Sequence, residues 1–141
     1  MVPRKEIIQV ISKVFQEIQP NLLYLPFQND IHSDHSIVFD AAASCTKSFR
    51  YPYIRRVMIY ETISETEFSI RPGKEQFKPN LWIDISDYID KKIEIMSLYE
   101  SEIGKEPFPR SEQNIRSLAK FRGSTAGVLS AEAFILLKEI I

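Results

Sequence analysis

Segments with helical spacing of apolar residues alternate along this chain with short apolar runs. Apolar positions recur every three or four residues in the helical segments, and the runs between them are too short for buried helices. The predicted helices cover 3–19, His35 to about Lys47, 87–103 and 111–127, with Gly123 interrupting the last; the predicted strands cover 21–27, 55–63 and 81–85. The tail, 131–141, fits either state. This alternation predicts an α/β layered, Rossmann-like fold with a mostly parallel sheet.

Composition excludes several classes of protein. The 141 residues suit a single domain over 1–141, and the 44% hydrophobic and 26% charged content is that of a globular chain. A formal net charge of -1 gives no reason to expect nucleic acid or an anionic membrane as partner. No apolar run could span a bilayer, and the amino-terminal residues lack a signal-peptide pattern. With Cys45 as its single cysteine, the chain is expected in the reducing cytoplasm.

Both histidines of the chain, His32 and His35, lie in one short loop. The loop follows the predicted strand 21–27, and ligands of open parallel sheets bind beyond the carboxyl ends of strands. His32 could polarise a substrate carbonyl or donate a proton, and Asp34 could fix the tautomer of a ring nitrogen. The loop is therefore a candidate site of metal binding and catalysis.

A simpler interpretation of the loop stays open. Asp34 is a good N-cap residue for the helix that follows, and His32 and Asp30 could be solvated loop residues. A hydrolytic zinc site needs about three protein ligands, and the sequence offers no evident third one. Asp30 is near in sequence, whereas Cys45 is three helical turns away.

Four stretches in order resemble the carboxyl-terminal part of the LmbE-like, or PIG-L, zinc-dependent N-deacetylases. "DIHSDHSIVFDAA" is similar to the family's His-x-Asp-His loop that opens a helix. "FKPNLWIDIS", "KKIEIMSLYESE" and "RGSTAGVLSAEAF" resemble a strand, a lysine-rich helix and the final segments of the family. The resemblance extends over essentially the whole chain, and the combination is more specific than any one motif.

The resemblance implies a role for each matched residue. His35 would bind a Zn2+ ion, His32 would assist at the substrate carbonyl, and Asp34 would orient His32. The family removes an N-acetyl group, usually from an N-acetylglucosamine-type sugar. The expected reaction is thus hydrolysis of an amide in a small amino-sugar substrate.

The chain departs from the family at its amino terminus. The family's His-Pro-Asp-Asp motif, which supplies two zinc ligands and the general base, does not occur in the sequence. The family's amino-terminal strands are also lacking, so the chain resembles a fragment, a split polypeptide or a truncated product. It is expected to be inactive alone and to need a complementing amino-terminal segment or a homo-oligomer.

Two other functions remain as alternatives. The chain could be a non-catalytic, truncated remnant that oligomerises or binds a partner. A different α/β hydrolase using His32 with Asp34 is less favoured, because no Gly-x-Ser-x-Gly nucleophile motif is present.

Overall fold

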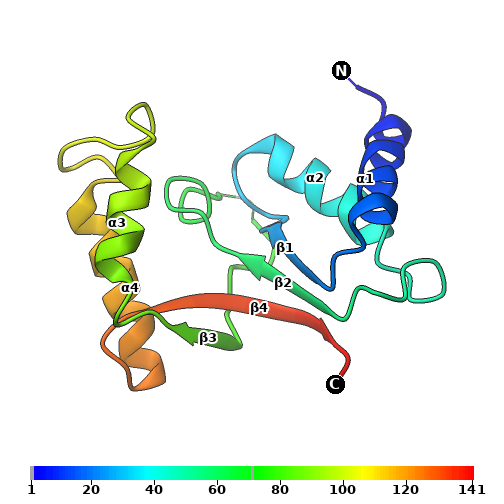
Figure 1. The fold of residues 1–141 in the computed structure, drawn as a ribbon. Coiled ribbons are helices and arrows are strands. Elements are labelled where there is room, and N and C mark those ends of the chain that lie inside the picture. Colours follow the sequence, from blue (N-terminus) through cyan, green and yellow to red (C-terminus); the bar gives the residue numbers. More distant parts are fainter. Residues whose placement is uncertain (1, 71) are drawn as a thin grey trace. The chain divides into compact units, whose positions relative to one another are not determined.

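A computed structural model describes residues 2–70 and 72–141 (Figure 1). The elements are α1 (Arg4–Ile18), β1 (Leu22–Pro26), α2 (Ser33–Ser44), β2 (Arg56–Tyr60), β3 (Leu81–Asp84), α3 (Ile89–Ser97), α4 (Glu112–Ala126) and β4 (Ala131–Glu139). The predicted α/β order is confirmed, and the ambiguous tail is a strand. No helix in the described part of the chain is both long and apolar enough to cross a membrane.

The strands hydrogen bond in the order β1-β2-β4-β3. β1 and β2 are parallel, whereas β3 and β4 are antiparallel, so the sheet is mixed. The chain divides into two compact units: Pro79–Phe134 forms one, and the rest of the chain forms the other. Arg71, in the connection between β2 and β3, lies outside the described residues.

The first unit is built on the parallel pair β1 and β2, whose inner side chains pack against α1 and α2. Its core consists of Leu23, Leu25, Ala42, Cys45, Tyr51, Ile54 and Val57. Ile8, Ile11 and Phe15 bring the inner side of α1 onto this core. Helix α1 ends at Gln19, whose left-handed φ of 52° turns the chain before Pro20. Burial of apolar area between helices and strands is therefore what holds this unit together.

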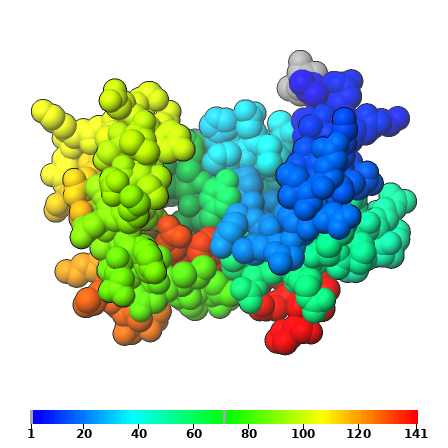
Figure 2. Space-filling view, in the orientation of Figure 1, coloured from blue at the N-terminus to red at the C-terminus, as the bar shows by residue number. Residues whose placement is uncertain are grey.

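The outer face of α1 is apolar and unburied. Val10, Val14 and Ile18 are spaced four residues apart and keep 64%, 41% and 69% of their surface exposed. In Figure 2 this amino-terminal helix (blue) lies at the surface of its unit. Because a helix usually buries its apolar positions, this face is available for a partner.

The register of β1 and β2 fixes the location of the candidate site. Pro26 is paired with Tyr60, so both strands end at the same edge. The loop 27–32 leaves from β1 at this edge, and the segment 61–78 leaves from β2. The histidine loop therefore follows the carboxyl end of a parallel strand, as the sequence predicts.

In the second unit, α4 runs through Gly123 without a break, so the predicted interruption was wrong. A Cβ at Gly123 would lie 2.7 Å from the carbonyl oxygen of Val128 and 2.8 Å from the backbone nitrogen of Ser130. The glycine thus allows the chain after the helix to return closely over its last turns. Ser111 caps the start of α4 by accepting a hydrogen bond from the N–H of Asn114.

Gly123→Ala is expected to destabilise the protein. Alanine favours a helix by about 1 kcal/mol over glycine, but overpacking against backbone atoms costs about 1–3 kcal/mol. The contacted atoms are backbone, so they cannot yield as a flexible side chain would. Urea denaturation should show a lower free energy of unfolding. The exposed Ser124→Ala on the same helix serves as control and should stay within about 0.5 kcal/mol of the parent. An unchanged or higher stability of Gly123→Ala would contradict this account.

The start of α3 also differs from the prediction. It begins at Ile89, two residues after the predicted start at 87, and its N-cap is Tyr88. The Ser86 hydroxyl donates to Asp84 Oδ1 at 2.6 Å and accepts a hydrogen bond from the N–H of Ser130 at 3.3 Å. Hydrogen bonds from Ser86 lower the pKa of Asp84. Ser86 therefore closes a turn after β3 instead of capping the helix.

Candidate functional site

His32 is the N-cap of α2, which begins at Ser33 and not near His35. Its ring Nδ1 accepts a hydrogen bond from the backbone N–H of Asp34 at 3.2 Å. The helix is thus capped by an imidazole, not by the Asp34 carboxylate. Because the accepting Nδ1 must be unprotonated, the neutral ring of His32 carries its hydrogen on Nε2. The exposed His32 therefore offers an N–H donor.

His35, one turn into α2, is paired with Asp30. Its Nδ1 lies 2.6 Å from Asp30 Oδ2, and the side chains are 22% and 0% exposed. Beside an ionised carboxylate, which only accepts hydrogen bonds, a neutral His35 ring donates from Nδ1 and keeps the lone pair on Nε2. A solvated Asp30 was one interpretation of the sequence, and the burial of its side chain shows that it was wrong.

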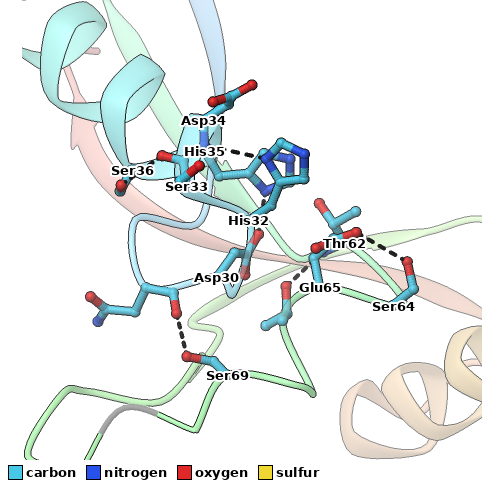
Figure 3. Close-up of polar contacts among 12 residues, drawn as sticks. Asp30, His32, Ser33, Asp34, His35, Ser36, Thr62, Ser64, Glu65 and Ser69 are labelled. Atoms are coloured by element: carbon cyan, nitrogen blue, oxygen red, sulfur yellow. Dashed lines mark hydrogen bonds and ion pairs between the residues drawn. The ribbon is translucent and has the colours of Figure 1, made fainter. Parts of the chain in front are cut away.

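The two imidazole rings stack on each other. Their centroids are 5.1 Å apart and their planes differ by 28°. Figure 3 shows the rings together at the start of α2, with the Asp34 carboxylate directed away from them. The stacked pair combines a nitrogen lone pair on His35 with an N–H donor on His32. This combination suits one metal-ligand position beside one donor to a substrate oxygen.

The segment after β2 holds the histidine loop by three hydrogen bonds. The N–H of Ile31 donates to the carbonyl oxygen of Glu65 at 3.2 Å, and Asn29 Nδ2 donates to the carbonyl oxygen of Glu75 at 3.0 Å. The Ser69 hydroxyl donates to the Asn29 carbonyl oxygen (Figure 3). The segment after β2 therefore holds in place the loop that carries both histidines.

The carboxylate of Asp30 also acts electrostatically on Tyr60, at the end of β2. Burial raises the pKa of its hydroxyl, and the negative charge of Asp30 raises it further. The folded state therefore holds this proton more tightly than the unfolded state does. The resulting stabilisation is present below the unfolded pKa of 10.0 and is lost as the pH rises through the higher folded pKa.

Asp30→Asn is expected to lower the pKa of Tyr60 without returning it to its ordinary value. The charge is removed, but burial, which is the larger cause, remains. An NMR titration of the tyrosine rings measures the change. Tyr53 is an internal control, because its raised pKa comes from burial and from Tyr51 and Cys45, not from Asp30. A Tyr60 pKa that stays unchanged or rises would contradict the proximity of the two groups.

A complete metal site is not assembled by the described residues. Within 2–70 and 72–141, no three histidine, cysteine, aspartate or glutamate side chains are placed to hold an ion. The lone pair on His35 Nε2 fits one ligand position of a zinc site, and no more. The roles of His35 in zinc binding and of Asp34 in orienting His32 through its carboxylate both stay predictions.

The fold has close counterparts among solved structures. TT1542, a conserved protein from Thermus thermophilus, aligns with a TM-score of 0.71 and 20% identity over 99% of this chain and 61% of its own. N,N'-diacetylchitobiose deacetylase from Pyrococcus horikoshii aligns with a TM-score of 0.71 and 19% identity over 96% of this chain and 53% of its own. The fold is LmbE-like.

A third LmbE-like counterpart has a different activity. It is GalB, the 4-carboxy-2-hydroxymuconate hydratase of Pseudomonas putida, with a TM-score of 0.69 and 15% identity over 100% of this chain and 62% of its own. No protein-family model matches the chain. The chain thus spans 53% to 62% of the length of these three proteins. Since a deacetylase and a hydratase share the LmbE-like fold, the fold alone does not decide the chemistry.

Proposed function

We propose that this chain is part of a zinc-dependent hydrolase that removes an N-acetyl group from an N-acetylglucosamine-type sugar or glycoconjugate. The observation that carries the proposal is the stacked pair of His32 and His35, which offers an N–H donor beside a nitrogen lone pair. The LmbE-like fold shared with a diacetylchitobiose deacetylase supports an amino-sugar as substrate.

Each residue of the pair has a separate task in this proposal. His35 Nε2 holds the metal, since its Nδ1 is engaged by Asp30. A zinc ion held there would supply Lewis-acid chemistry, polarising the amide carbonyl and activating a water molecule as the nucleophile. His32 donates a hydrogen bond from Nε2–H to the carbonyl oxygen as negative charge develops there, and it keeps this proton throughout. The proton that the attacking water releases passes to the departing amine by way of the general base, which the resemblance to the family assigns to the amino-terminal segment.

Asp34 keeps the imidazole of His32 in place. Its backbone N–H already holds the ring through Nδ1 at 3.2 Å. Rotation of the exposed side chain would also bring the negative charge of the carboxylate closer to the ring. Asp34 therefore orients His32, as the resemblance to the LmbE-like deacetylases implies.

A complementing amino-terminal segment supplies the remaining ligands. Zinc needs about three protein ligands for hydrolysis, and this chain contributes one. β1 lies at the end of the strand order, so a further strand can add beside it. The exposed face of α1, formed by Val10, Val14 and Ile18, offers apolar area for the same segment. A homo-oligomer formed through this edge is the alternative occupant.

The test is release of acetate from N-acetylglucosamine and N,N'-diacetylchitobiose in the presence of zinc. The chain is assayed alone and together with the amino-terminal polypeptide that carries a His-Pro-Asp-Asp motif. We expect equal amounts of acetate and free amine from the combination, and none from the chain alone. A zinc-loaded combination that releases no acetate from either sugar would refute the proposal. Self-association of the chain without zinc would favour a non-catalytic module.

A further inference from the structure

We propose that Asp30 is a positioning residue that fixes the tautomer of His35, with the hydrogen on Nδ1 and the lone pair on Nε2. The consequence for metal binding rests on the proposed function. The tautomer itself does not, since it is a property of this chain alone. Asp30 differs in burial from every other carboxylate in the described chain, because its side chain alone is fully buried.

The hydrogen bonds of Asp30 indicate this role. Oδ2 bonds the ring of His35 at 2.6 Å. Oδ1 is buried without a hydrogen-bond partner in the described part of the chain. Burying a carboxylate with one oxygen unsatisfied costs free energy, so stability gives no reason for a charge here. An acceptor that is fixed and cannot donate does have one specific effect: it forces the hydrogen of His35 onto Nδ1.

The backbone keeps Asp30 in position from both sides. Asn29, before it, donates to Glu75 and accepts from Ser69. Ile31, after it, donates to the carbonyl oxygen of Glu65. The Asp30 N–H itself donates to the carbonyl oxygen of Phe27 at 3.2 Å. A carboxylate held this firmly sets the direction of the His35 ring as well as its tautomer.

The segment 61–78 is also connected to His35 through Asp30. It makes three hydrogen bonds to the loop around Asp30, so it acts on His35 through Asp30. Within the described residues, Glu65, Ser69 and Glu75 hydrogen bond to neither histidine. The pKa of the Tyr60 hydroxyl, at the end of β2 directly before this segment, is raised in part by the negative charge of Asp30. Asp30 is thus the residue through which this segment and the histidine pair are connected.

The tautomer is measured by the ring ¹⁵N chemical shifts of His35 at a pH where the ring is neutral. We expect a protonated Nδ1 and an unprotonated Nε2 in the parent chain, the opposite of the form that an unconstrained imidazole prefers. Asp30→Leu removes the acceptor and should shift His35 to the Nε2–H form. Asp30→Asn retains an oxygen acceptor and should keep part of the Nδ1–H population. A parent chain with its hydrogen on Nε2 would overturn the proposal, whether or not any variant folds.

Asp34→Asn is the matched control, because Asp34 lies next to His35 in sequence but its carboxylate is exposed. It removes a nearby negative charge without touching the ring, so the tautomer of His35 should not change. A shift equal to that of Asp30→Leu would show a general charge effect and overturn the specific role of Asp30.

Zinc affinity gives the second readout, in the combination with the amino-terminal polypeptide. Loss of such a supporting carboxylate typically weakens metal binding about 10- to 100-fold, and we expect this for Asp30→Leu. An unchanged affinity would overturn the role of Asp30 toward the metal. If the parent combination binds no zinc at all, the proposed function fails, while the tautomer measurement still decides the role of Asp30 toward His35.

Discussion

His35→Asn is expected to abolish stoichiometric zinc binding by this chain combined with its amino-terminal polypeptide. The asparagine amide nitrogen lies near the place of Nδ1 and can still donate to Asp30, but nothing replaces the Nε2 lone pair. His35→Asn therefore removes the proposed metal ligand and retains a hydrogen-bond donor for the buried carboxylate of Asp30. Elemental analysis measures the metal, and His35→Ala, which removes both functions, should give the same loss with lower thermal stability.

His32→Asn is the matched comparison for this prediction. Asparagine is a preferred N-cap residue, so α2 should keep its first turn without the imidazole. Zinc content should remain at the parent level, while kcat falls by about 10²- to 10³-fold through loss of the hydrogen-bond donor to the carbonyl oxygen. If His32→Asn lost the metal and His35→Asn kept it, the proposed division of roles would be reversed and wrong.

Phe27→Ala is expected to cost about 3–5 kcal/mol of folding free energy, as truncation of a buried phenylalanine typically does. The side chain is 2% exposed, and its ring meets that of Phe77 edge to face with centroids 5.4 Å apart. Such a loss is a large part of the about 5–15 kcal/mol that stabilises a typical domain. Urea denaturation followed by circular dichroism measures it.

Phe27→Ala should also destabilise the loop that carries the two histidines. Phe27 begins the loop that carries Asp30, and Phe77 ends the segment that clamps this loop. Faster amide hydrogen exchange is therefore expected at Ile31, whose N–H bonds Glu65. Phe49→Ala is the control: this ring is 78% exposed, and its contact with Arg50 contributes about 1 kcal/mol at most. Similar losses for the two variants would mean that Phe27 is not a core residue.

The local pattern of apolar residues predicted well which helices and strands form, and predicted less well the residues at which they begin and end. The spacing of apolar residues placed both ends of α1 and β1 and the start of β2 within one residue, because each buries one face on the same core. The start of α2 was misplaced since its cap is an imidazole nitrogen, which cap preferences do not include. The tail became a strand through its pairing with β2 and β3, tertiary contacts that propensity cannot show.

The candidate site was predicted in part. The sequence places His32 and His35 after a buried strand and three residues apart, and the structure stacks them there. The importance of Asp30 was missed because its burial depends on the segment 61–78, which is distant in sequence and has no periodic pattern. Its position in the loop directly after a buried strand, five residues before His35, is the one signal that could have indicated it.

The antiparallel pairing of β3 with β4 has a consequence for synthesis. Asp84 pairs with Ala131, and both α3 and α4 lie in the chain between these residues. β3 therefore leaves the ribosome well before its partner strand, and its backbone groups stay unpaired while the two helices are made. Helices form from local contacts, so α3 and α4 can fold first and bring the two strands together afterwards. A pause in translation between them would prolong the time in which β3 is an open template for aggregation.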